Sequence, residues 1–219
     1  MKRPDTSRSL PQPQAQKLVT SELFGAYLAC PTKCFLLSTG EVSTGNAFAT
    51  WNQTRSESYR LDGTEKLTAE YPHKFDLSSP EPGPWKNAPW RFALAGGARA
   101  QNLVTSPHVI QRLSPKETAK SPQLVPIRFV HTNKISHSDK LMAGFDAFVL
   151  SKVLDVRVGL AKIIHGDNGA AFKLKTTTLS REVNKTIGKI DVLLSASSPP
   201  PLILNRHCAG GLSRCPRVI

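Results

Sequence analysis

Apolar residues recur at helical spacing near the start of the chain. The first group is spaced one and four residues apart, which predicts a helix with a single buried stripe. Its members are Leu23, Phe24, Tyr27 and Leu28. Thr20 or Ser21 is expected to cap this helix. It should end at Cys30, because Pro31 disfavours helical geometry in the residue before it. Pro31 can then open a second short helix that ends at Gly40.

A third helix is predicted over residues 46–61. Ala47, Phe48 and Trp51 would face inward on it, and Gly63 would stop it. Core packing is therefore the expected role of Trp51, although tryptophans can also stack on unpaired bases.

Two further helices have the clearest apolar patterns. The stronger one would be capped by Ser138 or Asp139 and would bury six residues. These are Leu141, Met142, Phe145, Phe148, Val149 and Val153. The last helix is marked by Leu179, Val183, Ile187, Ile190 and Leu194, and it closes at Ser198 and three prolines.

Strands are predicted in the second half of the chain. A short one is expected at residues 108–113, and the run LVPIRFVHT from Leu124 should form the next. Pro126 would place this second strand at a sheet edge or bulge, because proline cannot donate to a β-ladder.

A β-hairpin is predicted where VRVGLAKIIHG and AAFKLKT flank an Asp-Asn-Gly turn. His165, Asp167 and Asn168 lie together here and invite a catalytic interpretation. Turn formation explains Asp167 and Asn168 better, because Asp-Asn-Gly is favourable turn chemistry and positions no nucleophile.

The remaining segments predict loops around one domain. Residues 1–16 form a basic, polar tail, and residues 77–90 (LSSPEPGPWKNAPW) and 114–123 form loops. Trp85 and Trp90 in the first loop could either pack in the core or stack on bases. Residues 17–219 then form a single α/β domain, since helices are followed by strand, helix, hairpin and helix.

Charge favours a polyanionic partner. Lysine and arginine number 29 against 16 acidic residues, which gives a net charge of +13. Ribosomal, membrane-surface and nuclease proteins all share such a bias. The basic residues are spread along the chain rather than gathered in one block, which favours a folded basic face over a binding tail.

The four cysteines lie at the two ends of the chain, as Cys30, Cys34, Cys208 and Cys215. No stretch approaches the roughly 18 apolar residues that span a bilayer, so we expect a soluble, cytoplasmic protein without a membrane partner. A disulfide is disfavoured in a reducing compartment, which leaves thiols or metal ligation. Cys30, at a helix junction, should be exposed enough to reach a metal, whereas Cys34 should be packed.

Four segments resemble the RecB-type nucleases, relatives of the iron–sulfur exonucleases associated with CRISPR systems. They are TSELFGAYLACPTKCFL, DKLMAGFDAFVLSKVL, KIIHGDNGAAFKLKT and SSPPPLILNRHC, and the likeness covers about residues 16–215. The resemblance implies an α/β, restriction-endonuclease-like mixed sheet flanked by helices, with the N- and C-terminal helical and cysteine-bearing segments packed together. It also implies action on DNA with Mg²⁺ or Mn²⁺ as cofactor.

The resemblance further implies a 4Fe-4S cluster that joins the chain ends. Cys30 matches the first ligand, Cys208 the second, and Cys215 is a third candidate. Cys34 or His207 could substitute for a missing ligand.

The cysteine pattern departs from the family at its C-terminal end. Gly211 stands where the family has a cysteine, and the family's last ligand should lie a few residues beyond Cys215. The alternative to a cluster is a vestigial site whose thiols are metal-free or bind zinc adventitiously.

The family's catalytic residues are an aspartate on one strand and an acid-x-lysine on the next, which hold Mg²⁺ and activate water. By position, Arg128 stands where the acid belongs and Val130 where the lysine belongs, and Gln111 is neutral. Lys134 could supply positive charge. Asp146 is the nearest acid, and we expect it to face solvent or to cap its helix.

Three hypotheses follow. The first is a RecB-like nuclease acting on DNA. The second is a catalytically inactive nucleic-acid-binding module that retains the fold, with Arg128, Lys134 and Lys140 as candidate contacts. The third is a degenerate reading frame whose product folds poorly.

Overall fold

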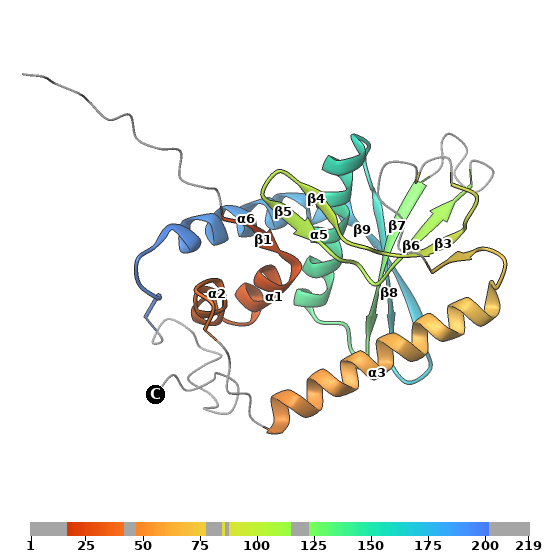
Figure 1. The fold of residues 1–219 in the computed structure, drawn as a ribbon, viewed down its shortest axis with the longest axis horizontal. Coiled ribbons are helices and arrows are strands. Elements are labelled where there is room, and N and C mark those ends of the chain that lie inside the picture. Colours follow the sequence, from red (N-terminus) through yellow and green to blue (C-terminus); the bar gives the residue numbers. More distant parts are fainter. Residues whose placement is uncertain (1–16, 42–46, 78–84, 86–87, 115–122, 202–219) are drawn as a thin grey trace, which may run out of the picture.

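Two mixed β-sheets with helices packed against them make up the described part of the chain (Figure 1). The computed structural model describes residues 17–41, 47–77, 85, 88–114 and 123–201. The smaller sheet has the strand order β1-β5-β4. Its strands are β1 (Val19–Thr20), β4 (Ala98–Ala100) and β5 (Leu103–Thr105).

The larger sheet has the order β2-β3-β6-β7-β8-β9. Its strands are β2 (Phe75–Asp76), β3 (Phe92–Leu94), β6 (Val109–Leu113), β7 (Gln123–Val130), β8 (Leu160–His165) and β9 (Ala170–Lys175). The pairs β2–β3 and β7–β8 are parallel, and the other neighbours are antiparallel. The predicted mixed α/β class is therefore confirmed in its coarse form.

Two helices cover opposite faces of the larger sheet. Helix α5 (His137–Leu154) connects the parallel strands β7 and β8, and its Leu150 packs with Ile110 and Leu124. Helix α3 (Ala47–Glu70) supplies Tyr59 and Leu67 to a separate core around Ile127 and Phe129. The alternation of Leu124 and Ile127 between these two cores follows from the two-residue period of a strand.

The N- and C-terminal helices pack together, as the sequence predicts. Helices α1 (Ser21–Ala29), α2 (Pro31–Ser38) and α6 (Ser180–Ser195), the last preceded by a 3₁₀ turn at Thr176–Thr178, share one core with α5. Phe24 of α1 stacks on Phe145 of α5, with ring centroids 4.4 Å apart. The Thr32 hydroxyl donates a 3.3 Å hydrogen bond to the carbonyl of Pro200. The C-terminal end of the described chain thus lies beside α2.

Local signals place most of these helices well. Thr20 caps α1 by accepting a hydrogen bond from the Leu23 N–H at 3.1 Å. Pro31 occupies the first turn of α2, where its missing N–H has no intrahelical role. Helix α5 begins slightly earlier than predicted, because Ser136 forms a capping box with Asp139.

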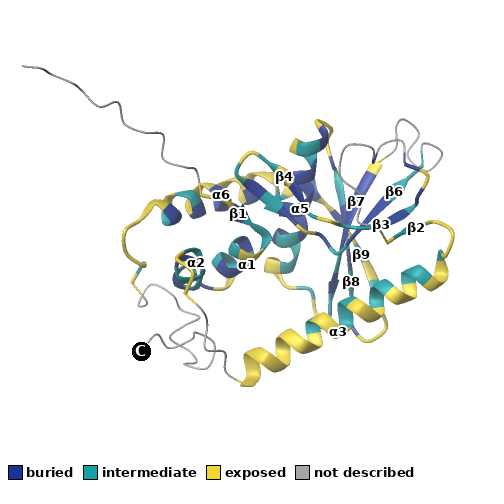
Figure 2. Cartoon of the chain, viewed as in Figure 1, coloured by how far each residue is buried: buried dark blue, intermediate teal, exposed yellow. Residues whose placement is uncertain are grey.

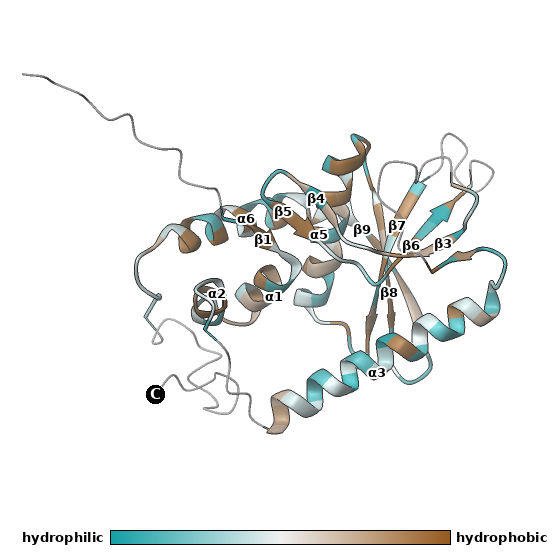
Figure 3. Cartoon of the chain, in the orientation of Figure 1, coloured by the Kyte–Doolittle hydropathy of each residue, from teal (hydrophilic) through white to brown (hydrophobic). Residues whose placement is uncertain are grey.

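The prediction for α3 is wrong in two respects. The helix continues through Gly63 to Glu70, and its first half is exposed rather than inward-facing, with Phe48 51% and Trp51 52% exposed (Figure 2). Hydrophobic and hydrophilic residues are interspersed along it (Figure 3). One glycine in a helix costs only about 1 kcal/mol, so Gly63 does not end α3, whose Tyr59 and Leu67 pack against the sheet.

Pro126 does not mark a sheet edge. Strand β7 lies inside the sheet between β6 and β8, and Pro126 pairs with Ile110. The ladder with β8 begins one residue later, where Ile127 pairs with Lys162. The missing N–H of Pro126 therefore falls just before that ladder starts, which explains how a central strand accommodates it.

The two tryptophans of the proline-rich loop belong to the core. Trp85 is 1% and Trp90 is 6% exposed, and their rings meet edge to face with centroids 6.4 Å apart. The interpretation of these two as base-stacking residues is therefore wrong. No helix among the described residues has the length and apolar character needed to cross a membrane.

Candidate functional site

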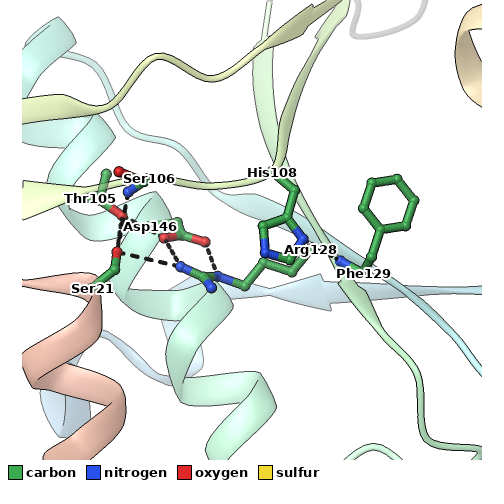
Figure 4. A network of polar contacts seen from close by, with 7 residues as sticks. All are labelled: Ser21, Thr105, Ser106, His108, Arg128, Phe129 and Asp146. Atoms are coloured by element: carbon green, nitrogen blue, oxygen red, sulfur yellow. Dashed lines mark hydrogen bonds and ion pairs between the residues drawn. The ribbon is translucent and has the colours of Figure 1, made fainter. Parts of the chain in front are cut away.

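The strand position assigned to the family's acid carries an ion pair. Arg128 of β7 points toward α5, where Asp146 lies (Figure 4). Its Nε donates to Oδ2 of Asp146 at 2.5 Å, and its Nη2 donates to Oδ1 at 2.7 Å. Bidentate pairing of this kind is among the stronger interactions of a guanidinium.

A buried hydroxyl completes the shell of this carboxylate. Thr105 donates to Asp146 Oδ1 at 2.5 Å, and Ser21 lies 3.1 Å from the Thr105 hydroxyl. The Asp146 side chain is 0% exposed and that of Arg128 is 12% exposed. The expectation that Asp146 faces solvent or caps its helix is therefore wrong. Three donors hold this carboxylate, and the cluster joins α1, β5, β7 and α5.

His108 lies beside the ion pair, immediately before β6. Its Nδ1 accepts a 2.9 Å hydrogen bond from the Phe129 N–H, and its ring lies parallel to that of Phe129 (Figure 4). Burial lowers the pKa of His108 to about 3, and the nearby charges of Arg128 and Arg60 act in the same direction. Both features favour a neutral imidazole, since a protonated ring has no lone pair for that N–H.

A second polar cluster lies on the opposite face of the sheet, the face covered by α3. Lys162 of β8 donates a 2.6 Å hydrogen bond to Oε1 of the buried Gln111 on β6, across the intervening strand β7. Lys173 of β9 is paired directly with Lys162 in the sheet register. Arg91, just before β3, has its guanidinium 5.5 Å from the centre of the Tyr71 ring.

The charges of this cluster act on one another. Burial lowers the pKa of Lys162 below its usual value, and the charges of Lys173 and Arg91 lower it further, while Glu70 opposes them. Three cations from three strands or strand ends thus concentrate positive charge on one face. We call Arg91, Lys162 and Lys173 the cationic cluster. An anion bound there would relieve the mutual repulsion, which makes the cluster a candidate phosphate site.

The predicted nucleic-acid contacts Arg128, Lys134 and Lys140 have different surroundings. Arg128 is held by Asp146, and the Lys140 ammonium lies 5.4 Å from the centre of the Phe172 ring. Lys134 is exposed, and its carbonyl accepts a hydrogen bond from the Thr132 hydroxyl.

The hairpin turn agrees with its structural interpretation. Asp167 accepts a 2.8 Å hydrogen bond from the side chain of Asn133, whose own side-chain oxygen accepts one from the Asp167 N–H at 2.9 Å. Asn168 accepts a hydrogen bond from the Ala170 N–H within the turn.

Two of the four cysteines, Cys30 and Cys34, lie among the described residues. Cys30 is 3% exposed at the junction of α1 and α2, so the expectation of an exposed thiol is wrong. The junction is packed rather than open, since Cys34 and Phe35 of α2 are buried as well. Cys34 is packed, as predicted, and burial raises the pKa of its thiol to about 11. His207, Cys208, Gly211 and Cys215 lie outside the described residues. Among the described residues no group of three or more His, Cys, Asp or Glu is arranged to hold a metal.

Sequence reasoning missed the cationic cluster and the role of His108. Lys162 and Lys173 lie on the two strands of the predicted hairpin. Pairing of these strands, with the two-residue period of their side chains, could have placed both lysines on one face. The approach of Arg91 depends on strand order, which the sequence pattern did not indicate.

Comparison with models of known protein families gave no match. A search among curated proteins also gave no significant match.

Proposed function

We propose that this chain is a nucleic-acid-binding domain that contacts the phosphate backbone through the cationic cluster. The observation that carries the proposal is the convergence of Lys162, Lys173 and Arg91 on one face of the sheet. A net charge of +13 over the chain supports a polyanionic partner. Gln111 is a neutral hydrogen-bond acceptor for Lys162, so it does not neutralise the lysine charge.

Binding without hydrolysis agrees best with the Arg128 and Asp146 geometry. The family's mechanism needs carboxylates that hold a divalent metal. Here Arg128 stands at the acid position, and both oxygens of Asp146 accept hydrogen bonds from its guanidinium. A metal ion at Asp146 would have to displace a buried, bidentate guanidinium, whose loss would leave an uncompensated charge.

A RecB-like nuclease is the second candidate. The adjacency of β6 and β7 in a mixed sheet flanked by helices supports it, since the family's catalytic residues lie on two consecutive strands. DNA labelled at one end, incubated with the protein and Mg²⁺ or Mn²⁺, separates the two candidates. We expect binding without release of nucleotides. Metal-dependent release that EDTA abolishes would overturn the non-catalytic proposal.

The binding experiment uses fluorescence anisotropy of a labelled oligonucleotide across a salt series. Affinity should fall steeply as salt rises, because each phosphate contact releases condensed counterions. Lys173→Gln should weaken binding and reduce the salt slope by about one. Lys185→Gln, which removes an exposed lysine from α6, is the matched control and should change neither. Absent or salt-insensitive binding would overturn the proposal.

We also propose that the chain ends hold an iron–sulfur cluster, with Cys30, Cys208 and Cys215 as ligands. Cys30 fits this role, because it lies two residues from Thr32, where the C-terminal segment is bound through Pro200. Cys34 fits less well, since a thiol pKa of about 11 opposes the thiolate that iron requires. Anaerobic purification should give a brown protein with bound iron and sulfide. A colourless, iron-free preparation would remove this part of the proposal.

A further inference from the structure

A cavity beside the first half of α3 contains no residue of the cationic cluster. It has a volume of about 420 Å³ and lies between α3, the residue after β7 and the β8–β9 turn. The residues that line it include Trp51, Arg55, Tyr59, Asp62, His131 and Asp167. Its volume is within the range of small-ligand sites.

Trp51 is the exposed tryptophan of the chain. Its side chain is 52% exposed, whereas Trp85 and Trp90 are buried. The Arg55 guanidinium lies 5.4 Å from the centre of the indole, and the Phe48 ring lies 5.9 Å from it at a tilt. Fold stability does not account for a large aromatic ring in this position, because burial is what makes such a ring stabilising.

Hydrogen bonds fix the other side of the cavity. Tyr59 donates to the carbonyl of Gly166 at 2.8 Å, which ties α3 to the β8–β9 turn. Ser56 and His131 Nδ1 are 3.0 Å apart, which ties the same helix to the end of β7. The cavity is therefore formed before any ligand enters, and little ordering is needed on binding.

We propose that this cavity takes one unpaired base of a single-stranded nucleic acid, stacked on Trp51. The inference rests on the proposed nucleic-acid binding and specifies its substrate class. Stacking needs an exposed base face, which a closed duplex offers only at its ends. Arg55 is the cation at the cavity and would contact the adjacent phosphate. Asp62 and Asp167 line the cavity and would face the edge of the base, whose amino groups are donors.

The test compares single-stranded and duplex oligonucleotides of the same length with three proteins. Trp51→Ala should lower affinity for the single strand about 5- to 150-fold, which is the range for loss of one stacked base. Its affinity for the duplex should not change. Leu61→Ala is the matched control, because Leu61 is 53% exposed on the same helix but does not line the cavity. Alanine favours helix, so both variants should fold.

Two further readouts sharpen the result. Trp51→Phe keeps an aromatic face and should restore most of the single-strand affinity. In the unmodified protein, a single strand should quench tryptophan fluorescence and protect it from acrylamide, because Trp51 is the accessible indole.

Three other outcomes would overturn either the proposed function or the base site. If the unmodified protein binds neither oligonucleotide, the proposed function fails, and this inference fails with it. If it binds both and Trp51→Ala binds as well as Leu61→Ala, only the base site is overturned. If Trp51→Ala instead changes the mass measured by light scattering, this helix face joins two copies of the chain, and the base site is again overturned.

Discussion

At the scale of single residues, the Arg128–Asp146 pair shows what sequence reasoning can and cannot reach. Comparison with the family's motif predicted that Arg128 occupies the acid position. It did not predict that Asp146 on the next helix forms an ion pair with Arg128. Helical periodicity identifies an apolar stripe and treats a charged residue as exposed. Asp146 is buried because Arg128 and Thr105 supply the donors that its carboxylate needs.

Breaking this pair from one side should be costly. Asp146→Asn leaves the Arg128 charge buried without its partner, so the free energy of unfolding should fall by about 3–5 kcal/mol. Urea denaturation measures this change. The double variant Arg128→Met/Asp146→Leu should lose less than Asp146→Asn, since both charges are gone. A double variant at least as unstable as the single one would contradict the buried-charge argument.

His108 should make stability depend on pH. Its pKa of about 3 in the folded protein lies below the value of 6.5 for an unperturbed histidine. The unfolded chain therefore takes up the proton first as pH falls. The contribution of neutral His108 to the free energy of unfolding is complete above pH 6.5. It declines by about 1.4 kcal/mol per pH unit between pH 6.5 and 3.

Unfolding free energies measured across this range test the role of His108. His108→Gln keeps a side-chain oxygen that can accept from the Phe129 N–H and has no proton to gain. The free energy of unfolding of this variant should fall less steeply with decreasing pH, because unfolding takes up about one proton fewer. Equal slopes for the two proteins would show that His108 titrates alike in the folded and unfolded states.

At the scale of elements, apolar periodicity predicted α1, α2, α5, α6 and the hairpin well. It failed for α3, which buries little apolar surface and packs on the sheet through a few residues that include Tyr59, Gly63 and Leu67. At Gly63, a β-carbon would lie 2.4 Å from two carbons of the Phe129 ring. The glycine that looked like a stop signal is there because the helix passes directly over β7. Such tertiary proximity leaves no trace in the local sequence.

Two glycine substitutions separate propensity from packing. Gly63→Ala should destabilise the protein by about 1–3 kcal/mol, since the methyl group must displace the Phe129 ring or shift α3. Gly188→Ala in α6 meets nothing within 4 Å and should stabilise by about 0.5–1 kcal/mol. Thermal and urea unfolding measure both. A stabilised Gly63→Ala variant would contradict the close contact.

At the scale of the whole molecule, the resemblance predicted that the helical segments at the two ends pack together, and they do. The positions of the cysteines at both ends of the chain are compatible with this packing but do not by themselves predict it. The cationic cluster depends on strand order, and pairings such as β6 with β7 and β7 with β8 arise from the whole sheet. This is why a charge argument based on composition alone could not single out Arg91, Lys162 and Lys173.

Thiol labelling can test how firmly the two ends are joined. In a Cys208→Ser/Cys215→Ser variant, Cys30 and Cys34 are the remaining thiols, and both are buried. They should react with a thiol reagent at pH 8 only as fast as the protein unfolds, because burial and, for Cys34, the raised pKa suppress the reaction in the folded protein. Rapid labelling of a folded sample would show that α2 opens independently of the rest.

The hydrogen bond between Thr32 and Pro200 spans 168 residues of chain. A ribosome releases α1 and α2 long before it has made α6, the helix whose Val183, Ile187 and Ile190 share their core. Helices α1 and α2 must therefore wait, with apolar faces uncovered, until α6 has been made. Chaperones should therefore hold the nascent chain while the residues between α2 and α6 are synthesised.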